Sequence, residues 1–142
     1  MYLALKKTSP KSATNLQKFI SDAIKWRLCS NYSHGGIVIG DTLYHSSYMN
    51  KGLYSEKFDM SNSPGWDFFY LGDKKDEEVI KLYNKLEGTS YDLLGLLTFI
   101  VSFQADYEKL YCFEWCGLAL GLNIVNRVTP EDLLVHISQN KI

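Results

Sequence analysis

Two histidines and one cysteine are the residues of this chain whose types and order could support covalent catalysis. His34 and His45 lie in the segment YSHGGIVIGDTLYHSS, and Cys112 lies in the later segment LYCFEWCGLALGL. A cysteine nucleophile needs a base that takes its proton and a third group that orients the base. The two imidazoles can fill both roles if the fold brings them to the cysteine.

The two histidines are predicted to share one face of a β-hairpin. Residues 36–39 and 43–45 are short runs of strand-forming residues, and Gly40-Asp41 between them suits a two-residue type II′ turn. In this register Ile39 faces Thr42, and alternate side chains lie on one face of the sheet. That face consists of His34, Gly36, Val38, Leu43, His45 and Ser47.

Cys112 is predicted to open a helix that runs to about Gly121. A thiol in the first turn of a helix lies near its positive end and near unpaired backbone N–H groups. These groups favour the thiolate and can hold an oxyanion. Cys116 lies one turn later on the same helix face and is interpreted as a core residue.

The same side chains allow two other interpretations. Cys112 and Cys116 could join His34 and His45 in a Cys₂His₂ zinc site, although the tight knuckle of most structural zinc sites is missing. Alternatively, none of these residues is reactive, because a cysteine in an apolar helix is most often a small buried residue. The aromatic segment from Tyr48 to Tyr70 would then form the contact surface of a binding module.

The composition indicates one globular domain over residues 1–142. Hydrophobic residues make up 46% and charged residues 22%, and the net charge of −1 gives no sign of a nucleic-acid-binding stripe. The odd count of three cysteines argues against a disulfide framework and favours a reducing compartment. The N-terminus lacks the pattern of a signal peptide, so a cytoplasmic location is expected. The apolar stretch Leu93–Phe103 is about half the length of a membrane span and is interpreted as a buried helix.

The elements that must position the candidate residues form an α+β domain, a small antiparallel sheet packed with helices. Besides the hairpin, strands are predicted over residues 1–6, at a sheet edge, 53–58 and 66–71. Helices are predicted over residues 14–31, 73–88, 90–101, 112–121 and from 129 onward. Thr14 with Gln17 fits a capping box, with Ser12 as an alternative cap of the same helix. Asp73 is the expected second cap, and Thr129 precedes a proline at the first helical position.

Taken in order, these segments resemble a known enzyme family. The series YSHGGIVIG, LYHSS, YDLLGLL, YCFEWCGLALGL and VTPEDLL is similar to the circularly permuted NlpC-type papain-like cysteine hydrolases. That family includes the lecithin–retinol acyltransferase relatives and the YiiX-type bacterial proteins. The resemblance covers roughly residues 12–135 and implies a permuted papain-like fold. Phe113 departs from the serine that often follows the family's cysteine, whereas Glu114 is kept.

The resemblance implies a role for each candidate residue. Cys112 matches the nucleophile, His34 the base and His45 the orienting residue, with Ser47 as the alternative third member. The implied reaction is hydrolysis of an amide bond in a peptide or a peptidoglycan fragment, with no cofactor. A cytoplasmic enzyme would need lysis, injection or secretion to reach the cell wall. The same residues could also serve a thioesterase, a deamidase or an acyltransferase.

Overall fold

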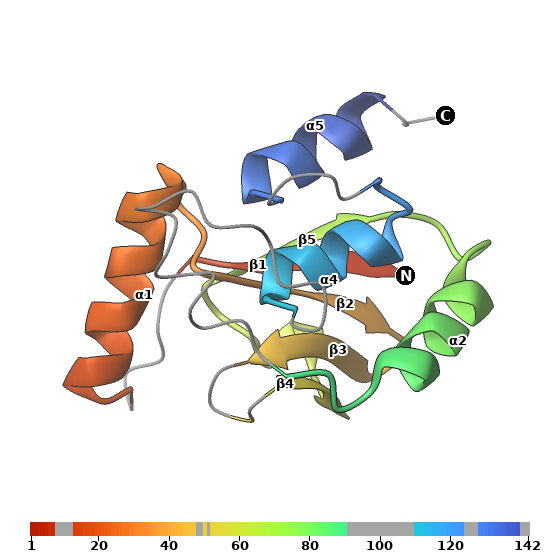
Figure 1. Cartoon of the computed structure of the whole chain (residues 1–142), viewed down its shortest axis with the longest axis horizontal. Coiled ribbons are helices and arrows are strands. Elements are labelled where there is room, and N and C mark those ends of the chain that lie inside the picture. Colours follow the sequence, from red (N-terminus) through yellow and green to blue (C-terminus); the bar gives the residue numbers. More distant parts are fainter. Residues whose placement is uncertain (8–12, 48–49, 51, 91–109, 124–127, 140–142) are drawn as a thin grey trace.

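A five-stranded antiparallel sheet forms the centre of the molecule (Figure 1). The computed structural model describes residues 1–7, 13–47, 50, 52–90, 110–123 and 128–139. The strands are β1 (Tyr2–Lys6), β2 (His34–Ile39), β3 (Thr42–Ser47), β4 (Gly52–Lys57) and β5 (Trp66–Tyr70), in the spatial order β4-β3-β2-β1-β5. This architecture confirms the α+β class.

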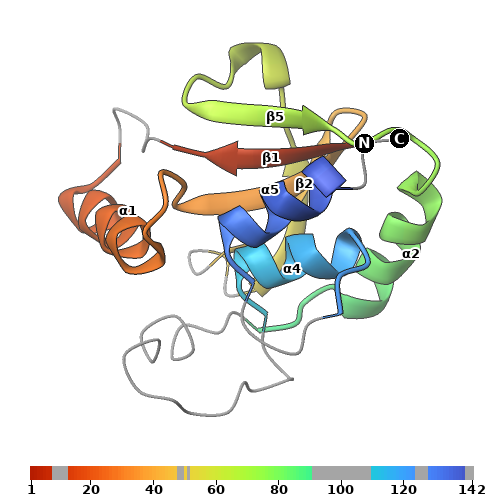
Figure 2. The ribbon, with the colours of Figure 1, turned by 90° about the horizontal axis from the view of Figure 1, so that it is seen from above.

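The described helices lie on one face of the sheet and at its two ends (Figures 1 and 2). Those of the described residues are α1 (Asn15–Leu28), α2 (Asp76–Leu86), α4 (Cys112–Ala119) and α5 (Pro130–Gln139), with a 3₁₀ turn at Met60–Asn62. Figures 1 and 2 both show α1 at one end of the molecule and α2 at the other, with α4 between them. The helix predicted over residues 90–101 lies outside the described residues. Among the described helices, none is both long and apolar enough to cross a bilayer.

The local signals for the hairpin and two helix starts are confirmed. Strand β2 pairs with β3 through Ile39 opposite Thr42 and the next two pairs, as predicted. Gly40 has a φ of 61°, which the first position of a type II′ turn requires. Helix α1 begins with the Thr14–Gln17 capping box, and the Thr129 hydroxyl caps α5 by accepting a backbone N–H.

The two faces of the sheet carry separate apolar clusters. The first, which we call the histidine face, is the side on which His34 and His45 lie; its cluster contains Ala4, Val38 and Leu43, with Tyr2, Phe58, Met60, Trp66 and Phe68 packed against it. The opposite side, the helix face, belongs to the main core. Its strand residues include Leu3, Leu5, Ile37 and Leu53, and its helical residues include Trp115, Leu133 and Ile137.

Helix α4 is attached to the sheet by hydrogen bonds as well as by packing. It packs against β2 and β3. The indole of Trp115, which is fully buried, donates to the Tyr44 carbonyl over 2.7 Å, and the Ser46 hydroxyl donates to the Leu110 carbonyl over 2.7 Å. Buried polar atoms need such partners. These two bonds therefore fix the position of α4, and of the residue before its start, relative to β3.

Two sequence-based expectations about the N-terminal half are wrong. Strand β1 is not an edge strand but lies between β2 and β5, because residues 3–5 are buried in succession and meet apolar groups on both faces. Asp73 does not cap α2. Its carboxylate instead accepts from the N-terminal ammonium of Met1 over 2.8 Å, and Lys75 occupies the cap position without a side-chain bond.

Gly36 marks the tightest approach between β2 and β3 on the histidine face. A Cβ at this position would lie 2.7 Å from Leu43 Cδ1 and 2.9 Å from His45 Cβ. We expect Gly36→Ala to lower the free energy of unfolding by about 1–3 kcal/mol, as other overpacked sites do. Urea denaturation measures this loss, and an unchanged midpoint would contradict the packing described for this face.

Candidate active site

His34 and His45 form a hydrogen-bonded pair on the histidine face. His34 Nε2 lies 2.7 Å from His45 Nδ1, and the two rings meet edge to face with centroids 5.0 Å apart. His34 opens β2 and is partly buried, whereas His45 in β3 is only 4% exposed. The prediction that the two imidazoles share a face and come within reach of each other is confirmed.

Glu56 of β4 extends this pair to a third group. Its Oε1 lies 3.1 Å from His45 Nε2, which is ion-pair distance, although the ring N–H does not point along a hydrogen bond to this oxygen. We therefore treat Glu56 as a charge beside the ring. The contact with His45 lowers the pKa of the Glu56 carboxyl, against the opposing effect of its partial burial.

Glu56 was missed by the sequence reasoning because strand pairing decides its place. It lies opposite Leu43 in the β3–β4 ladder, and Tyr54 lies opposite His45. Residues two apart share a face, so Glu56 becomes a diagonal neighbour of His45. Glu56 does lie in the strand predicted over residues 53–58. Its place beside His45 could be predicted only from the pairing of that strand with the hairpin.

The three groups define one arrangement of protons. A carboxylate next to Nε2 of His45 favours the tautomer with its proton on that nitrogen. The Nδ1 of a neutral His45 is then an acceptor, so the Nε2–H of His34 donates to it. This assignment leaves the Nδ1 of His34 unprotonated, and that atom can accept a proton during a reaction.

Aromatic and cationic side chains surround the pair. Tyr54 packs against His45 with centroids 4.3 Å apart, and Trp66 lies edge-on to His34 at 6.0 Å. Lys6 stands beside His34 in the β1–β2 ladder, with its Nζ 5.5 Å from the centre of the Trp66 ring. Burial, with the neighbouring His45 and the Lys6 charge, lowers the pKa of His34 well below 6.5. His34 is therefore neutral at pH 7.

Cys112 opens α4, as predicted, but it does so as a buried thiol. Glu114 accepts the backbone N–H of Tyr111 over 3.2 Å, which closes the first turn around Cys112. The thiol is 2% exposed, and burial raises its pKa to about 12. Backbone N–H groups, among them that of Gly35, act in the opposite direction, as expected for a helix start. Burial dominates, so the expected preference for thiolate is wrong for this resting state.

The sheet separates the thiol from the histidine pair. An added Cβ on Gly35 would meet the Phe113 ring at 3.0 Å, so Gly35 presents the helix face to α4. His34, its neighbour in β2, points to the opposite face. Among the described residues no hydrogen bond joins Cys112 to His34. The two groups instead flank the same stretch of backbone, and the Gly35 N–H lowers the pKa of the Cys112 thiol against the larger effect of burial.

The other candidate residues do not form a shared site. Cys116 is fully buried in the main core, as interpreted from its spacing. Within the described part of the chain, no three His, Cys, Asp or Glu side chains are grouped to hold a metal ion, so the arrangement does not favour the Cys₂His₂ interpretation. Ser47 interacts with the Tyr54 hydroxyl, and His45 rather than Ser47 is bonded to His34.

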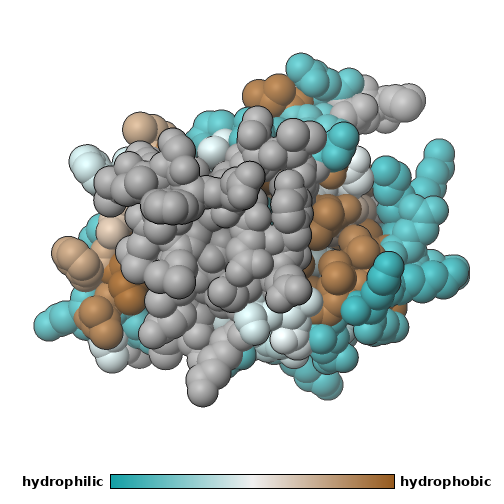
Figure 3. All heavy atoms as spheres, viewed as in Figure 1, coloured by the Kyte–Doolittle hydropathy of each residue, from teal (hydrophilic) through white to brown (hydrophobic). Residues whose placement is uncertain are grey.

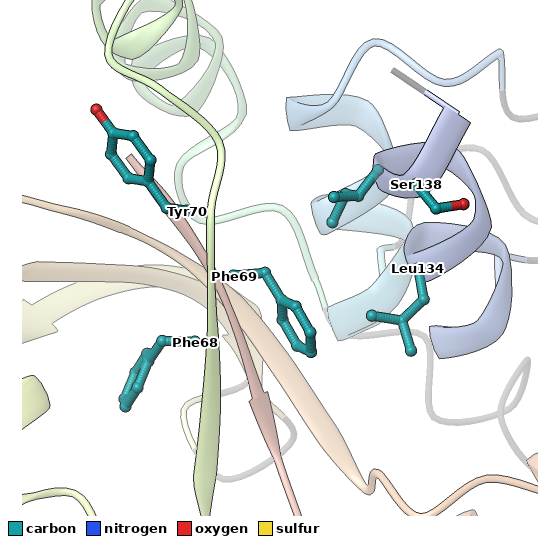
Figure 4. A pocket seen from close by; sticks show the side chains of 6 residues that line it. Phe68, Phe69, Tyr70, Leu134 and Ser138 are labelled. Atoms are coloured by element: carbon teal, nitrogen blue, oxygen red, sulfur yellow. The ribbon is translucent and has the colours of Figure 1, made fainter. Parts of the chain in front are cut away.

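A groove of about 530 Å³ lies elsewhere, between β5 and α5 (Figure 4). The Phe69 ring points from the strand toward Leu134 of the helix, while Phe68 and Tyr70 point to the other side. The remaining lining residues are Ile137 and Ser138. No candidate catalytic residue lines this groove, so it is not part of the histidine site.

The lowered pKa of His34 makes stability depend on pH in a defined direction. Between pH 6.5 and the lower pKa of the folded state, the unfolded chain binds a proton at this position that the folded chain does not. Stability therefore falls with falling pH, by at most about 1.4 kcal/mol per pH unit. We expect the difference in unfolding free energy between wild type and His34→Gln to shrink from pH 7 to pH 5. A constant difference across this range in urea denaturation would show that His34 titrates normally.

Comparisons with known proteins assign no function to this site. No protein-family model matches the chain, and no match was found among curated proteins.

Proposed function

We propose that this protein is a cysteine hydrolase that cleaves an amide bond through an acyl-enzyme, on a permuted papain-like fold. The observation that carries the proposal is the chain of His34, His45 and Glu56, joined by contacts of 2.7 and 3.1 Å. Such a chain orients one imidazole as a base. It ends at His34, whose neighbour Gly35 lies against the ring of Phe113, the residue after Cys112.

The protonation states favour one version of the mechanism. The pKa of His34 is lowered and that of Cys112 is raised to about 12. The resting pair is therefore a neutral imidazole and a neutral thiol, and not a preformed ion pair. His34 Nδ1 takes the thiol proton as the sulfur attacks, which is general-base catalysis.

The attack requires a shift of the start of α4 relative to β2, because Cys112 lies in the core on the helix face whereas His34 lies on the opposite face. Catalytic hydrogen bonds are often long or absent in a resting enzyme and form only with substrate. The sulfur then bonds to the carbonyl carbon, and the backbone N–H of Cys112 helps to hold the oxyanion at the start of α4. His34 returns the proton to the leaving amine, and water releases the acyl group and regenerates the thiol.

The proposed substrate is a peptide or a peptidoglycan stem-peptide fragment, and the resemblance to NlpC-type hydrolases supports this choice. The same groups can act on a thioester, a side-chain amide or a lipid ester, since each reaction begins with attack of a thiol on a carbonyl. The cytoplasmic location, with delivery to the wall by lysis, injection or secretion, is part of the proposal.

A binding module that keeps this fold is the second candidate. The 2% exposure of Cys112 favours it, because a structural cysteine is buried and inert whereas a reactive one is accessible. The contact surface would include the aromatic residues of β5, whose Tyr70 is 58% exposed. Residues 48–49 and 51 of the segment assigned to this surface lie outside the described residues.

Replacement of the thiol separates these two functions. We expect Cys112→Ala to abolish turnover of a panel of muropeptides and acyl esters, because it removes the proposed nucleophile that forms the acyl-enzyme. Loss of one buried sulfur should cost about 1 kcal/mol, a few degrees in the thermal midpoint. Cys29→Ala is the matched control, since Cys29 is exposed, and it should retain full activity. Undiminished turnover by Cys112→Ala would end the hydrolase proposal.

Glu56 offers a test of whether the contacts from Glu56 to His45 and from His45 to His34 orient the proposed base. We expect Glu56→Gln to lower kcat by about 10–100-fold with little change in KM, because the neutral amide no longer fixes the His45 tautomer. Nitrogen NMR of the imidazoles should show mixed His45 tautomers in the variant and one tautomer in wild type. Glu78→Gln, on the exposed side of α2, is the control. An unchanged tautomer and kcat would remove Glu56 from the mechanism.

A further inference from the structure

Strand β5 has an edge along which main-chain groups face away from the sheet. In an antiparallel ladder, residues that exchange hydrogen bonds with the neighbouring strand alternate with residues that do not. The Leu71 N–H donates to the Met1 carbonyl over 3.1 Å, so the odd-numbered residues of β5 are those bonded to β1. The N–H and C=O groups of Phe68 and Tyr70 therefore point away from β1. Among the described strands none pairs with that side of β5.

The groove between β5 and α5 runs along this edge. Phe68 and Tyr70 line the groove, yet Figure 4 shows their side chains pointing to the other side of the strand. They therefore border the groove through their main chain. The Phe69 ring points into the groove toward Leu134. The groove thus combines main-chain hydrogen-bonding groups with an apolar wall.

Helix α5 turns its apolar side toward the groove. Leu134 and Ile137 line the groove and belong to the main core or pack against it. Figure 1 shows α5 above the sheet, and in the same view Figure 3 shows hydrophilic and hydrophobic atoms side by side on its outer surface. The hydroxyl of Ser138, which also lines the groove, donates to the Val135 carbonyl over 2.7 Å. The helix therefore offers an occupant mainly apolar contact.

The two edges of the sheet differ in how they are protected against a further strand. On β4, the Leu53 N–H already donates to the Thr89 carbonyl over 2.9 Å. Glu56 and Lys57 follow on the same strand as exposed charges, which protect sheet edges from pairing. Strand β5 has one charged residue, Asp67, and its carboxylate lies on the side chain of another strand instead of guarding the edge. The edge of β5 is therefore the one suited to pairing.

We propose that the groove between β5 and α5 binds an extended peptide segment of a partner protein as a further antiparallel strand, with an apolar side chain of that segment under α5. In this mode of recognition the main-chain bonds give affinity and the pocket gives specificity. The inference involves neither Cys112 nor the histidine pair, so it is independent of the proposed hydrolase activity.

Strand β5 sets the register of the peptide. Phe68 and Tyr70 each offer one N–H and one C=O, so two peptide residues, two positions apart, exchange bonds with them. The peptide residue between these two lies opposite Phe69. Its side chain points to the same face of the sheet as Phe69, which is the face that carries the groove. This central position therefore requires an apolar residue.

Two other occupants match the groove less well. A second copy that paired its β5 with this edge would bring a Phe69 ring that already packs against its own core and points toward its own α5. The groove would then gain no new side chain. A purely apolar ligand, such as a lipid tail, would leave the main-chain groups of Phe68 and Tyr70 without partners, which costs free energy.

Titration calorimetry with synthetic peptides tests the addition of a strand. The probe is the acetylated and amidated peptide Thr-Val-Leu-Val-Thr, for which we expect a dissociation constant of about 0.1–1 mM. Methylation of both valine nitrogens, which face β5, should abolish binding. Methylation of the leucine nitrogen, which faces solvent, is the matched control and should leave the affinity within about twofold. Replacement of the leucine by aspartate should weaken binding at least about tenfold. An unmodified peptide that does not bind, or methylated forms that bind equally, overturn the proposal.

A matched pair of variants tests the edge in the protein itself. Tyr70→Pro removes the outward N–H of residue 70 and keeps the bonds to β1, because a strand tolerates proline where its N–H faces away from the sheet. Tyr70→Ala removes the same side chain and keeps the N–H. We expect the peptide to bind Tyr70→Pro at least about tenfold more weakly than Tyr70→Ala. Equal affinity for the two folded variants overturns the proposal, and if Tyr70→Pro does not fold, the methylated peptides decide.

Two further measurements test the other occupants. Sedimentation velocity should show a monomeric wild type at about 200 µM. A dimer that Tyr70→Pro dissociates and Tyr70→Ala retains would assign the edge to a second copy and overturn the proposal. Decanoate is the apolar probe and should bind more weakly than the peptide. Decanoate that binds more tightly than the peptide, and equally to Tyr70→Pro and Tyr70→Ala, would assign the groove to an apolar ligand and also overturn it.

Discussion

The alternation of side chains along β2 is the constraint on which the candidate site depends. His34 and Gly35 are neighbours, and a strand must send them to opposite faces. The absence of a side chain on Gly35 lets the Phe113 ring, and with it the start of α4, lie against the strand. His34 meanwhile joins His45 on the other face. The cysteine at the start of α4 and the histidine pair therefore lie on either side of a single stretch of backbone.

Burial decides the charge states of the groups on both faces. A thiol and an imidazole taken out of water both resist ionisation, and neither has a full opposite charge in direct contact. Glu56 keeps its charge because it is about half exposed and lies beside His45. Among His34, His45 and Glu56, the carboxylate of Glu56 is thus the one formal negative charge, and His45 lies between it and His34. This arrangement suits the transfer of one proton between neutral groups that we propose for Cys112 and His34.

Features determined by neighbouring residues could be predicted from the sequence. The Gly40 turn sets the β2–β3 register, and the capping residues Thr14 and Thr129 set the starts of α1 and α5. The shared face of His34 and His45 follows from the same register. These features depend on a few residues that are close in sequence, and the physical preference of each is strong enough to act without the rest of the fold.

The sequence by itself therefore determined the α+β class, the hairpin with its two imidazoles, and a cysteine at a helix start. Tertiary structure alone decided that β1 lies inside the sheet, that Glu56 joins His45, that Asp73 binds the N-terminus instead of capping α2, and that Cys112 is buried on the helix face. Each of these depends on contacts between segments far apart in the chain. The spacing of apolar residues and the intrinsic preference for helix or strand do not determine which strands pair or which face of the sheet a helix covers. Many different pairings would bury a similar apolar area.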